Sequence, residues 1–135
     1  MNEDNQILPL AWGFVSTESG DNWSFFLSHF HRTFPSIDDA KITAISDRSK
    51  GLEPALTAEF SNAIHAYCCK HLCDNLMKLH PGGKVRNLFW KAAKARSKVQ
   101  FTEYLEAIRK LHQTAAEYLD QIPSQHWAKY TISGL

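Results

Sequence analysis

The chain has 135 residues and a mass of 15.4 kDa, which is the size of a single domain. Apolar residues make up 44% of it and aromatic residues 12%, so it can bury a hydrophobic core and is not a disordered tail. The net charge of +1 does not by itself indicate a polyanionic partner, and three clustered cysteines do not make a disulfide scaffold. No apolar run is long enough to span a bilayer. We therefore expect a soluble intracellular protein with no membrane partner, and nothing in the sequence indicates a small-molecule substrate.

The first 35 residues predict one strand followed by one helix. Ile7–Val15 is rich in bulky side chains and is predicted as a strand. Pro9 cannot donate a ladder hydrogen bond, so this strand should lie at a sheet edge or carry a bulge. A stripe of apolar residues at helical spacing follows, consisting of Trp23, Phe26, Leu27, Phe30 and Phe34. We expect Asp21 or Asn22 to cap this helix and Pro35 to stop it.

The middle of the chain predicts two more strands, each followed by a helix. The strands are expected over Ile42–Ser46 and Ala63–Tyr67, and the helices over Leu52–Phe60 and Cys69–Leu79. The run His80–Gly83 then breaks the pattern, because it contains a proline and two glycines.

After this break the sequence predicts only helices. Two apolar stripes mark the longer ones, namely Val85, Leu88, Phe89 and Ala92, then Phe101, Leu105, Ile108 and Leu111. Shorter helices are expected over Thr114–Gln121 and Ser124–Tyr130. Strands that alternate with helices before a helical run indicate an α/β fold with an all-helical C-terminal part. We expect residues 1–80 to form the α/β core and residues 81–135 to be a helical extension of the same domain.

The small net charge hides an uneven distribution. Residues 1–60 contain nine acids and four bases, giving −5, whereas residues 61–100 contain eight bases and one acid, giving +7. On a helical wheel, one quadrant holds Lys84, Lys91, Lys94 and Lys98. Such a surface suits a nucleic-acid backbone, but it also suits an ordinary solvated helix face, so the pattern alone leaves both interpretations open.

Asp47 is a candidate for carrying chemistry. It follows the strand predicted over Ile42–Ser46, and ligands of open α/β sheets bind at the carboxyl ends of strands. A carboxylate in that position can bind Mg²⁺ when further carboxylates converge on it. Position alone also allows Asp47 to cap a loop or the following helix.

The run His65-x-x-Cys68-x-x-His71, with Cys69 and Cys73 nearby, contains the residue types of a zinc site. It could supply three or four nitrogen and sulfur ligands for tetrahedral Zn²⁺, so a small zinc-binding module is one hypothesis. The alternative is that these side chains hydrogen-bond and pack locally, because a free cysteine behaves as a small hydrophobic residue.

Six segments, in order along nearly the whole chain, carry a resemblance to a known family. They are Asn5–Gly13 (NQILPLAWG), Ser19–Leu27 (SGDNWSFFL), Ile45–Leu52 (ISDRSKGL), His65–Leu72 (HAYCCKHL), Phe89–Ala93 (FWKAA) and Ile122–Tyr130 (IPSQHWAKY). Together they resemble the catalytic core of Mutator-like element (MULE) transposases, eukaryotic DNA-cutting enzymes with an RNase H-like fold. Ordered blocks over this length are more specific than any single motif.

The resemblance implies a function and a site. In that family three acidic residues bind two divalent ions, Mg²⁺ or Mn²⁺, which promote DNA cleavage and strand transfer. Asp47 falls on the second of these acids, and His65, Cys68 and His71 fall on the family's His-Cys-His element. The resemblance also implies DNA as the ancestral substrate and the nucleus as the location.

The chain departs from the family pattern at the other two acids. The first acid is expected upstream of Asn5, so the chain starts too late to include it, and Asp4 falls in a hairpin turn and does not replace it. The third acid falls on Gln100, a neutral amide, with Glu103 as the nearest alternative. We therefore predict a fragment or degenerate copy of a transposase that is inactive alone, because the first catalytic aspartate is missing.

The same departure affects the fold. The family's sheet has the strand order 3-2-1-4-5, and this chain supplies strands 3, 4 and 5, which predicts an incomplete RNase H-like fold of about three strands with flanking helices. Unpaired strand edges would then allow self-association. The alternative function is a domesticated, non-enzymatic remnant that binds protein, or binds DNA through Lys84, Lys91, Lys94 and Lys98.

Overall fold

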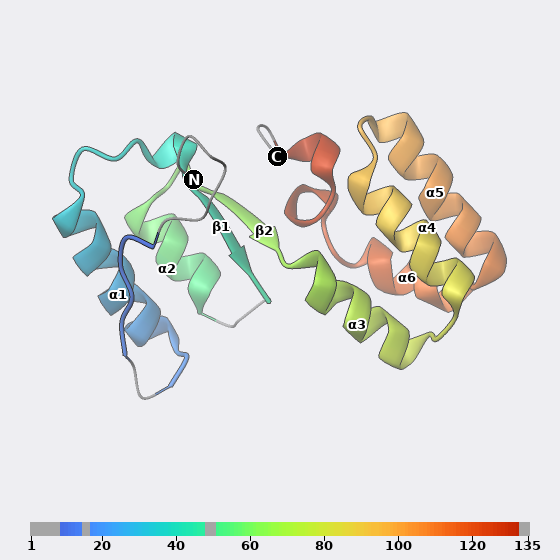
Figure 1. The fold of residues 1–135 in the computed structure, drawn as a ribbon, viewed down its shortest axis with the longest axis horizontal. Coiled ribbons are helices and arrows are strands. Elements are labelled where there is room, and N and C mark those ends of the chain that lie inside the picture. The colour runs from blue at the N-terminus through green and yellow to red at the C-terminus, as the bar shows by residue number, and fades with distance from the viewer. Residues whose placement is uncertain (1–8, 15–16, 48–50, 133–135) are drawn as a thin grey trace. The chain divides into compact units, whose positions relative to one another are not determined.

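The computed structural model describes residues 9–14, 17–47 and 51–132, which belong to two compact units (Figure 1). The first unit comprises Met1–Ile42 and Ser49–Ala63, and the second comprises Thr43–Arg48 and Ile64–Leu135. With η denoting a 3₁₀ turn, the elements are α1 (Gly20–Thr33), η1 (Asp39–Lys41), β1 (Thr43–Ser46), α2 (Leu52–Glu59), β2 (Ile64–Tyr67), α3 (Cys69–Leu79), α4 (Gly83–Lys94), α5 (Lys98–Leu111), α6 (Gln113–Asp120), η2 (Ser124–His126) and η3 (Lys129–Thr131). The described residues thus form a mixed, mostly helical structure with six α-helices and a short parallel sheet.

The helix predicted from the aromatic stripe is α1. Its N-cap is Ser19, whose Oγ accepts a hydrogen bond from the Asn22 N–H at 3.3 Å. The prediction that Asp21 or Asn22 caps the helix is therefore wrong, because Ser19 already satisfies one of the first N–H groups. The helix ends at Thr33, just before Pro35, as predicted.

The second helix of the first unit, α2, packs against α1. Its inward-facing side chains are Leu52, Ala55 and Leu56. Phe60, the C-cap residue that follows the helix, is 1% exposed, and its ring centroid lies 6.2 Å from that of Phe30. A hydrogen bond adds to this packing, since His31 Nδ1 lies 2.9 Å from Glu59 Oε1. The helix predicted over Leu52–Phe60 is confirmed, one residue shorter.

The backbones of α1 and α2 meet at two glycines. Gly51, the residue before α2, has φ +88°, a left-handed conformation that glycine adopts without strain. A Cβ atom on Gly51 would lie 2.6 Å from the backbone nitrogen of Gly20, closer than real Cβ contacts occur. The approach of the two helices therefore depends on the absence of a side chain at Gly51.

The strand predicted over Ile7–Val15 is not present in the part of it that the structure describes. Residues 9–14 have no strand structure, and residues 7, 8 and 15 lie outside the described residues. Leu10, Trp12 and Phe14 are 61%, 77% and 92% exposed. A strand exists only while its backbone groups pair with a neighbouring strand, and an apolar pattern cannot supply that neighbour. The described residues accordingly contain two strands and not about three.

The sheet lies in the second unit. Both of its strands, β1 and β2, were expected from the sequence, and they pair in parallel with Cα partners running from Thr43 and Ile64 to Ser46 and Tyr67. Because the two strands point the same way, the residues that follow them leave the sheet at the same edge. Asp47 follows β1 and Cys68 follows β2 at that edge.

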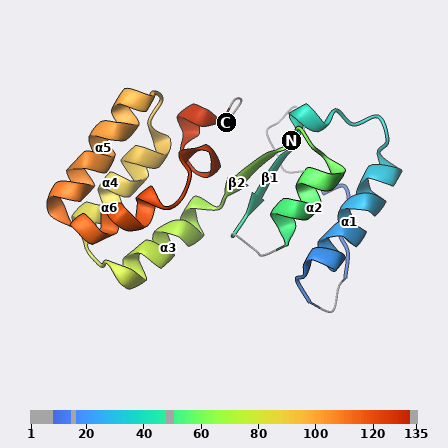
Figure 2. The same ribbon diagram turned by 180° about the vertical axis from the view of Figure 1, so that it is seen from behind.

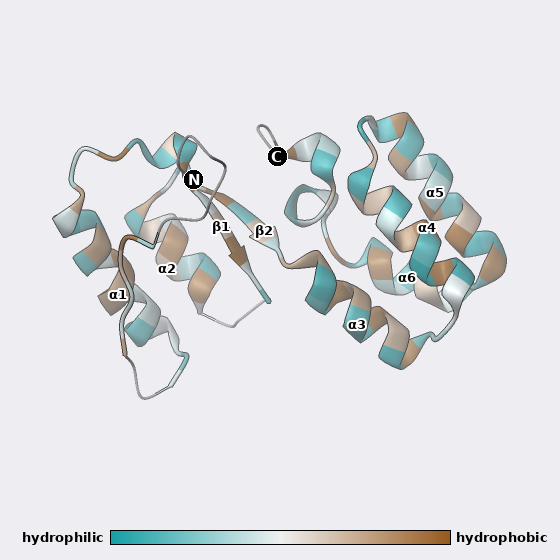
Figure 3. Ribbon diagram, viewed as in Figure 1, coloured by the Kyte–Doolittle hydropathy of each residue, from teal (hydrophilic) through white to brown (hydrophobic). Residues whose placement is uncertain are grey.

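The hydrophobic core of the second unit is enclosed by α3, α4, α5 and α6. Figures 1 and 2 both show α4 beside α5, and α6 also packs against α5. Apolar and polar residues alternate along α4 and α5 in Figure 3, as expected for helices with one buried side. Phe89 is fully buried and stacks on Trp127, with ring centroids 5.4 Å apart at 10°. The helix predicted over Cys69–Leu79 matches α3 in full, and the two apolar stripes after the break form α4 and α5.

The segment Ser124–Tyr130 is not the helix that was predicted. It forms the two 3₁₀ turns η2 and η3 on either side of Trp127, which is 2% exposed. The Trp127 indole N–H donates to the Ile122 carbonyl at 3.2 Å. Burying this one large ring and bonding it back to Ile122 favours a turn over a regular helix here.

Candidate functional site

Asp47 lies at the carboxyl edge of the parallel sheet. It directly follows Ser46, the last residue of β1, and is exposed. This is the strand-end position at which sheet ligands bind. Among the described residues, however, no group of three or more His, Cys, Asp or Glu side chains is placed to hold a metal ion. Asp47 and the other described side chains therefore do not fit a two-metal centre, and no cleavage step can be assigned to them.

The two candidates for the third acid lie on α5 in other surroundings. Gln100 takes part in capping that helix: its Oε1 accepts the Arg96 N–H at 3.2 Å, and its own N–H donates to Ser97 Oγ at 3.2 Å. Glu103 is exposed and lines a shallow hollow beside Lys98. In the part of the chain that the structure describes, Glu103 does not join Asp47 in a group of three metal-binding side chains.

His65, on β2, forms hydrogen bonds to residues of β1 and η2. Its Nε2 lies 2.8 Å from Ser46 Oγ on β1, and its backbone carbonyl accepts a hydrogen bond from His126 Nδ1 at 2.7 Å. His126 must therefore carry its proton on Nδ1. The His126 ring also stacks on Tyr67, with centroids 4.6 Å apart. These contacts give His65 a packing role between β1, β2 and η2.

The three cysteines differ in chemistry. Cys68 precedes α3, and hydrogen bonds from the backbone N–H and the side chain of His71 lower the pKa of its thiol. Burial raises the pKa of Cys69 and of Cys73. Cys68 is therefore the most acidic of the three thiols.

The four residues of the hypothetical zinc module, His65, Cys68, His71 and Cys73, are all described and do not form a metal-binding group in this structure. His65 faces Ser46, and Cys73 is 2% exposed in the core of α3 and α4. Only Cys68 and His71 meet. Two ligands do not make a structural zinc site, which takes four.

The stretch between positions 75 and 102 contains basic residues but no aspartate or glutamate. All seven basic side chains in this stretch are exposed, namely Lys78, Lys84, Arg86, Lys91, Lys94, Arg96 and Lys98. None of them is in an ion pair with another described residue, whereas Arg109 pairs with Glu106 and Asp120 on the next helices. The prediction that Lys98 lies on the same helix as Lys84, Lys91 and Lys94 is wrong. The α4 helix ends at Lys94, and Lys98 begins α5, because Ser97 caps a new helix.

A hollow of about 400 Å³ lies between α4 and the start of α5. Its lining consists of Trp90, Lys91, Lys94, Ala95, Arg96, Gln100 and Tyr104. The Lys94 ammonium lies over the Trp90 ring, 5.6 Å from its centroid. Sequence reasoning named Lys91 and Lys94 but missed Trp90, Arg96 and Tyr104. The sequence did contain a signal for Trp90, because this aromatic residue directly precedes Lys91 and lies four positions, about one helical turn, before Lys94.

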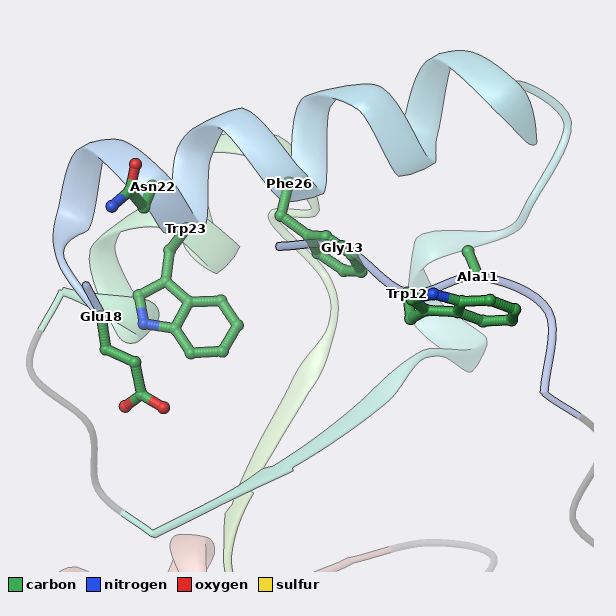
Figure 4. Close-up of a pocket in the computed structure, with 7 residues that line it drawn as sticks. All are labelled: Ala11, Trp12, Gly13, Glu18, Asn22, Trp23 and Phe26. Atoms are coloured by element: carbon green, nitrogen blue, oxygen red, sulfur yellow. The ribbon is translucent and has the colours of Figure 1, made fainter. Parts of the chain in front are cut away.

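The first unit has a hollow of about 380 Å³ that contains no predicted site residue (Figure 4). The Trp23 and Phe26 rings of α1 line it, and Gly13 lies against the Phe26 ring. Of the described residues in its lining, Glu18 alone carries a charge. The described residues thus place the aromatic, basic hollow in the second unit and a mainly apolar one in the first.

Comparison with known proteins gives the class of the chain. A family model described as the MULE transposase domain matches residues 1–75, more than half of the 135 residues. The chain belongs to this transposase family. The match ends within α3, so α4, α5 and α6 lie outside it, although the resemblance in the sequence continues to Tyr130. No curated protein and no solved structure matches the chain. Among the described helices, none has the length and apolar character needed to cross a membrane.

Proposed function

We propose that this chain is a DNA-binding protein of transposase origin, which uses the basic surface of α4 and the start of α5. The observation that carries the proposal is the set of seven exposed cations between positions 75 and 102, unpaired with any described acid. Lysines free of ion pairs release counterions from DNA when they bind phosphates, and this release drives affinity. Membership of a transposase family supports DNA as the ligand. Lys84, Lys91, Lys94 and Lys98 are the proposed phosphate contacts.

The test is the salt dependence of binding to a duplex. Replacing the four lysines by glutamine is expected to weaken binding and to reduce the slope of log K against log salt by roughly 0.9 for each phosphate that the variant no longer neutralises. The matched control neutralises Lys41 and Lys110, exposed lysines outside the stretch, and should leave the slope nearly unchanged. Duplex binding that does not depend on salt, or no binding at all, would refute the proposal.

The proposal extends to the ancestral catalytic core. Asp47 at the end of β1, in a parallel pair of strands, supports an RNase H-like core with Asp47 as its second acid and a ligand of Mg²⁺ or Mn²⁺. Glu103 is the proposed third acid. Because the described acids do not form a three-ligand group, we propose that this chain binds DNA without cutting it. Cleavage in the presence of Mg²⁺ or Mn²⁺ that disappears in Asp47→Asn would contradict this.

Organisation and location follow as part of the same proposal. Residues 1–80 would be the transposase-derived core and residues 81–135 its helical extension, acting on chromosomal DNA in the nucleus. The sheet has two strands in the described residues, and Ile45 on β1 is 63% exposed, so we propose that a sheet edge also pairs two copies. Sedimentation should then show a concentration-dependent dimer that Ile45→Lys abolishes. A monomer at all concentrations would exclude the pairing.

A further inference from the structure

The hollow between α4 and α5 combines cationic and aromatic side chains. Lys91, Lys94 and Arg96 supply three cations, while Trp90 and Tyr104 supply two aromatic rings. Among the described residues that line it, none is acidic. Cations bind phosphates, and aromatic rings stack on nucleic-acid bases, so the lining matches both halves of a nucleotide.

The Trp90 ring is held in a fixed position. Phe89, its neighbour in the chain, is fully buried, and the two ring centroids lie 5.4 Å apart in an edge-to-face arrangement. The Trp90 side chain is partly buried and packs against the core cluster that contains Cys73. A ring fixed on its inner side loses little conformational entropy when a ligand stacks on its outer side.

Lys94 currently occupies that outer side. Its ammonium lies 5.6 Å from the centroid of the Trp90 ring, one helical turn along α4. A single cation–π contact holds an ammonium group only weakly, whereas a phosphate offers it a full negative charge. Binding of a phosphate by Lys94 would therefore uncover the ring for the attached base.

A second hollow of about 300 Å³ adjoins the first, because Trp90 and Lys94 line both. It is lined by further aromatic side chains, Tyr67, His126 and Trp127, and by Lys129. Two adjoining hollows that share an aromatic ring and a cation suit consecutive nucleotides of a strand better than one small molecule.

We propose that this groove binds the unpaired bases of single-stranded DNA; the inference rests on the proposed DNA binding. In a duplex the bases are already stacked and paired, so only phosphates reach the groove. A single strand can place its bases on Trp90 and Tyr104 as well. The hollow between α4 and α5 lies outside the residues matched by the family model, so its own lining is what indicates the ligand there.

The test compares dT12 with a 12-base-pair duplex and with an abasic 12-mer that has the same phosphates but no bases. We expect dT12 to bind at least about fivefold more tightly than either, as one stacked base predicts. Tyr104→Leu keeps an apolar side chain and should weaken dT12 binding about 5- to 150-fold, while Tyr104→Phe, which still stacks, stays within about twofold. Duplex binding should be the same in both variants.

A spectroscopic measurement covers the case in which Tyr104→Leu does not fold. In Trp12→Phe/Trp23→Phe protein, the remaining tryptophans are Trp90 and the buried Trp127. Stacking of dT12 should quench this fluorescence, whereas the abasic 12-mer should not.

The outcomes separate this inference from the proposed function. If the duplex binds with the expected salt slope but dT12 binds no more tightly than the abasic 12-mer and causes no quenching, the groove proposal is overturned while DNA binding stands. If neither nucleic acid binds, both fail. Binding of an acidic peptide as tight as that of dT12, or of rU12 more than about tenfold tighter, would also overturn it, because the groove would then be built for another partner.

Discussion

Replacing Gly51 by alanine should destabilise the first unit far more than the addition of one methyl group suggests. A Cβ atom at this position would lie 2.6 Å from the Gly20 nitrogen and 2.7 Å from the Gly20 Cα. Both are backbone atoms at the start of α1, so they cannot swing aside as a side chain would. In addition, the φ of +88° is strained for any residue with a side chain.

The magnitude follows from these two effects. A non-glycine residue in the left-handed region costs roughly 1–2 kcal/mol. Overpacking that shifts backbone adds typically about 1–3 kcal/mol. We therefore expect Gly51→Ala to lower the free energy of unfolding of the first unit by about 2–5 kcal/mol.

Gly20→Ala and Gly83→Ala are the matched controls. A Cβ on Gly20 would lie 3.8 Å from the Gly51 Cα, an ordinary contact, and a Cβ on Gly83 would meet nothing within 4 Å. Both residues are helical, so alanine should be neutral or stabilise by up to about 1 kcal/mol.

The assay is amide hydrogen exchange in α1 and α2, with α5 as the internal reference. Exchange should accelerate in α1 and α2 of Gly51→Ala and remain unchanged in α5. If Gly51→Ala costs no more than Gly20→Ala, the close approach of the two helices is not the constraint described above.

Three further predictions concern the second unit. Iodoacetamide should alkylate Cys68 before Cys69, and the rate should fall as pH is lowered through the depressed pKa of Cys68; faster labelling of Cys69 would contradict the assignment. Phe89→Ala should cost about 3–5 kcal/mol in denaturant unfolding, because it empties a fully buried site beside Trp127, and a loss below about 1 kcal/mol would argue against that packing. Gln100→Ala should cost about 0.5–2 kcal/mol through the lost cap, whereas Gln100→Glu keeps the acceptor and should cost less; equal losses would exclude the capping role.

Local patterns predicted the elements whose signals lie within their own residues. The α3 helix over Cys69–Leu79 is bounded by a strand and by a Pro-Gly-Gly break, and its bounds match the prediction. Both strands were found because short runs between turn residues leave few alternatives. The position of Asp47 at a strand end followed from β1 alone.

Features that depend on partners distant in the sequence could not be predicted. A strand over Ile7–Val15 needs a neighbour that the pattern does not name, and the helix expected over Ser124–Tyr130 gives way to the burial of Trp127. The metal-ligand spacing of His65 and Cys73 was misleading, because one faces a strand and the other the core. The basic groove needs α4 and α5 side by side, which only the fold supplies.

The hydrogen bond from His126 to the His65 carbonyl joins residues 61 positions apart. It fastens the last turns of the described chain to the backbone of β2, with the Tyr67 ring stacked against His126. Truncating the protein after residue 80 to obtain the transposase-derived portion would remove this hydrogen bond to β2. Residues 1–80 should therefore fold more stably when they are expressed together with the helical C-terminal part.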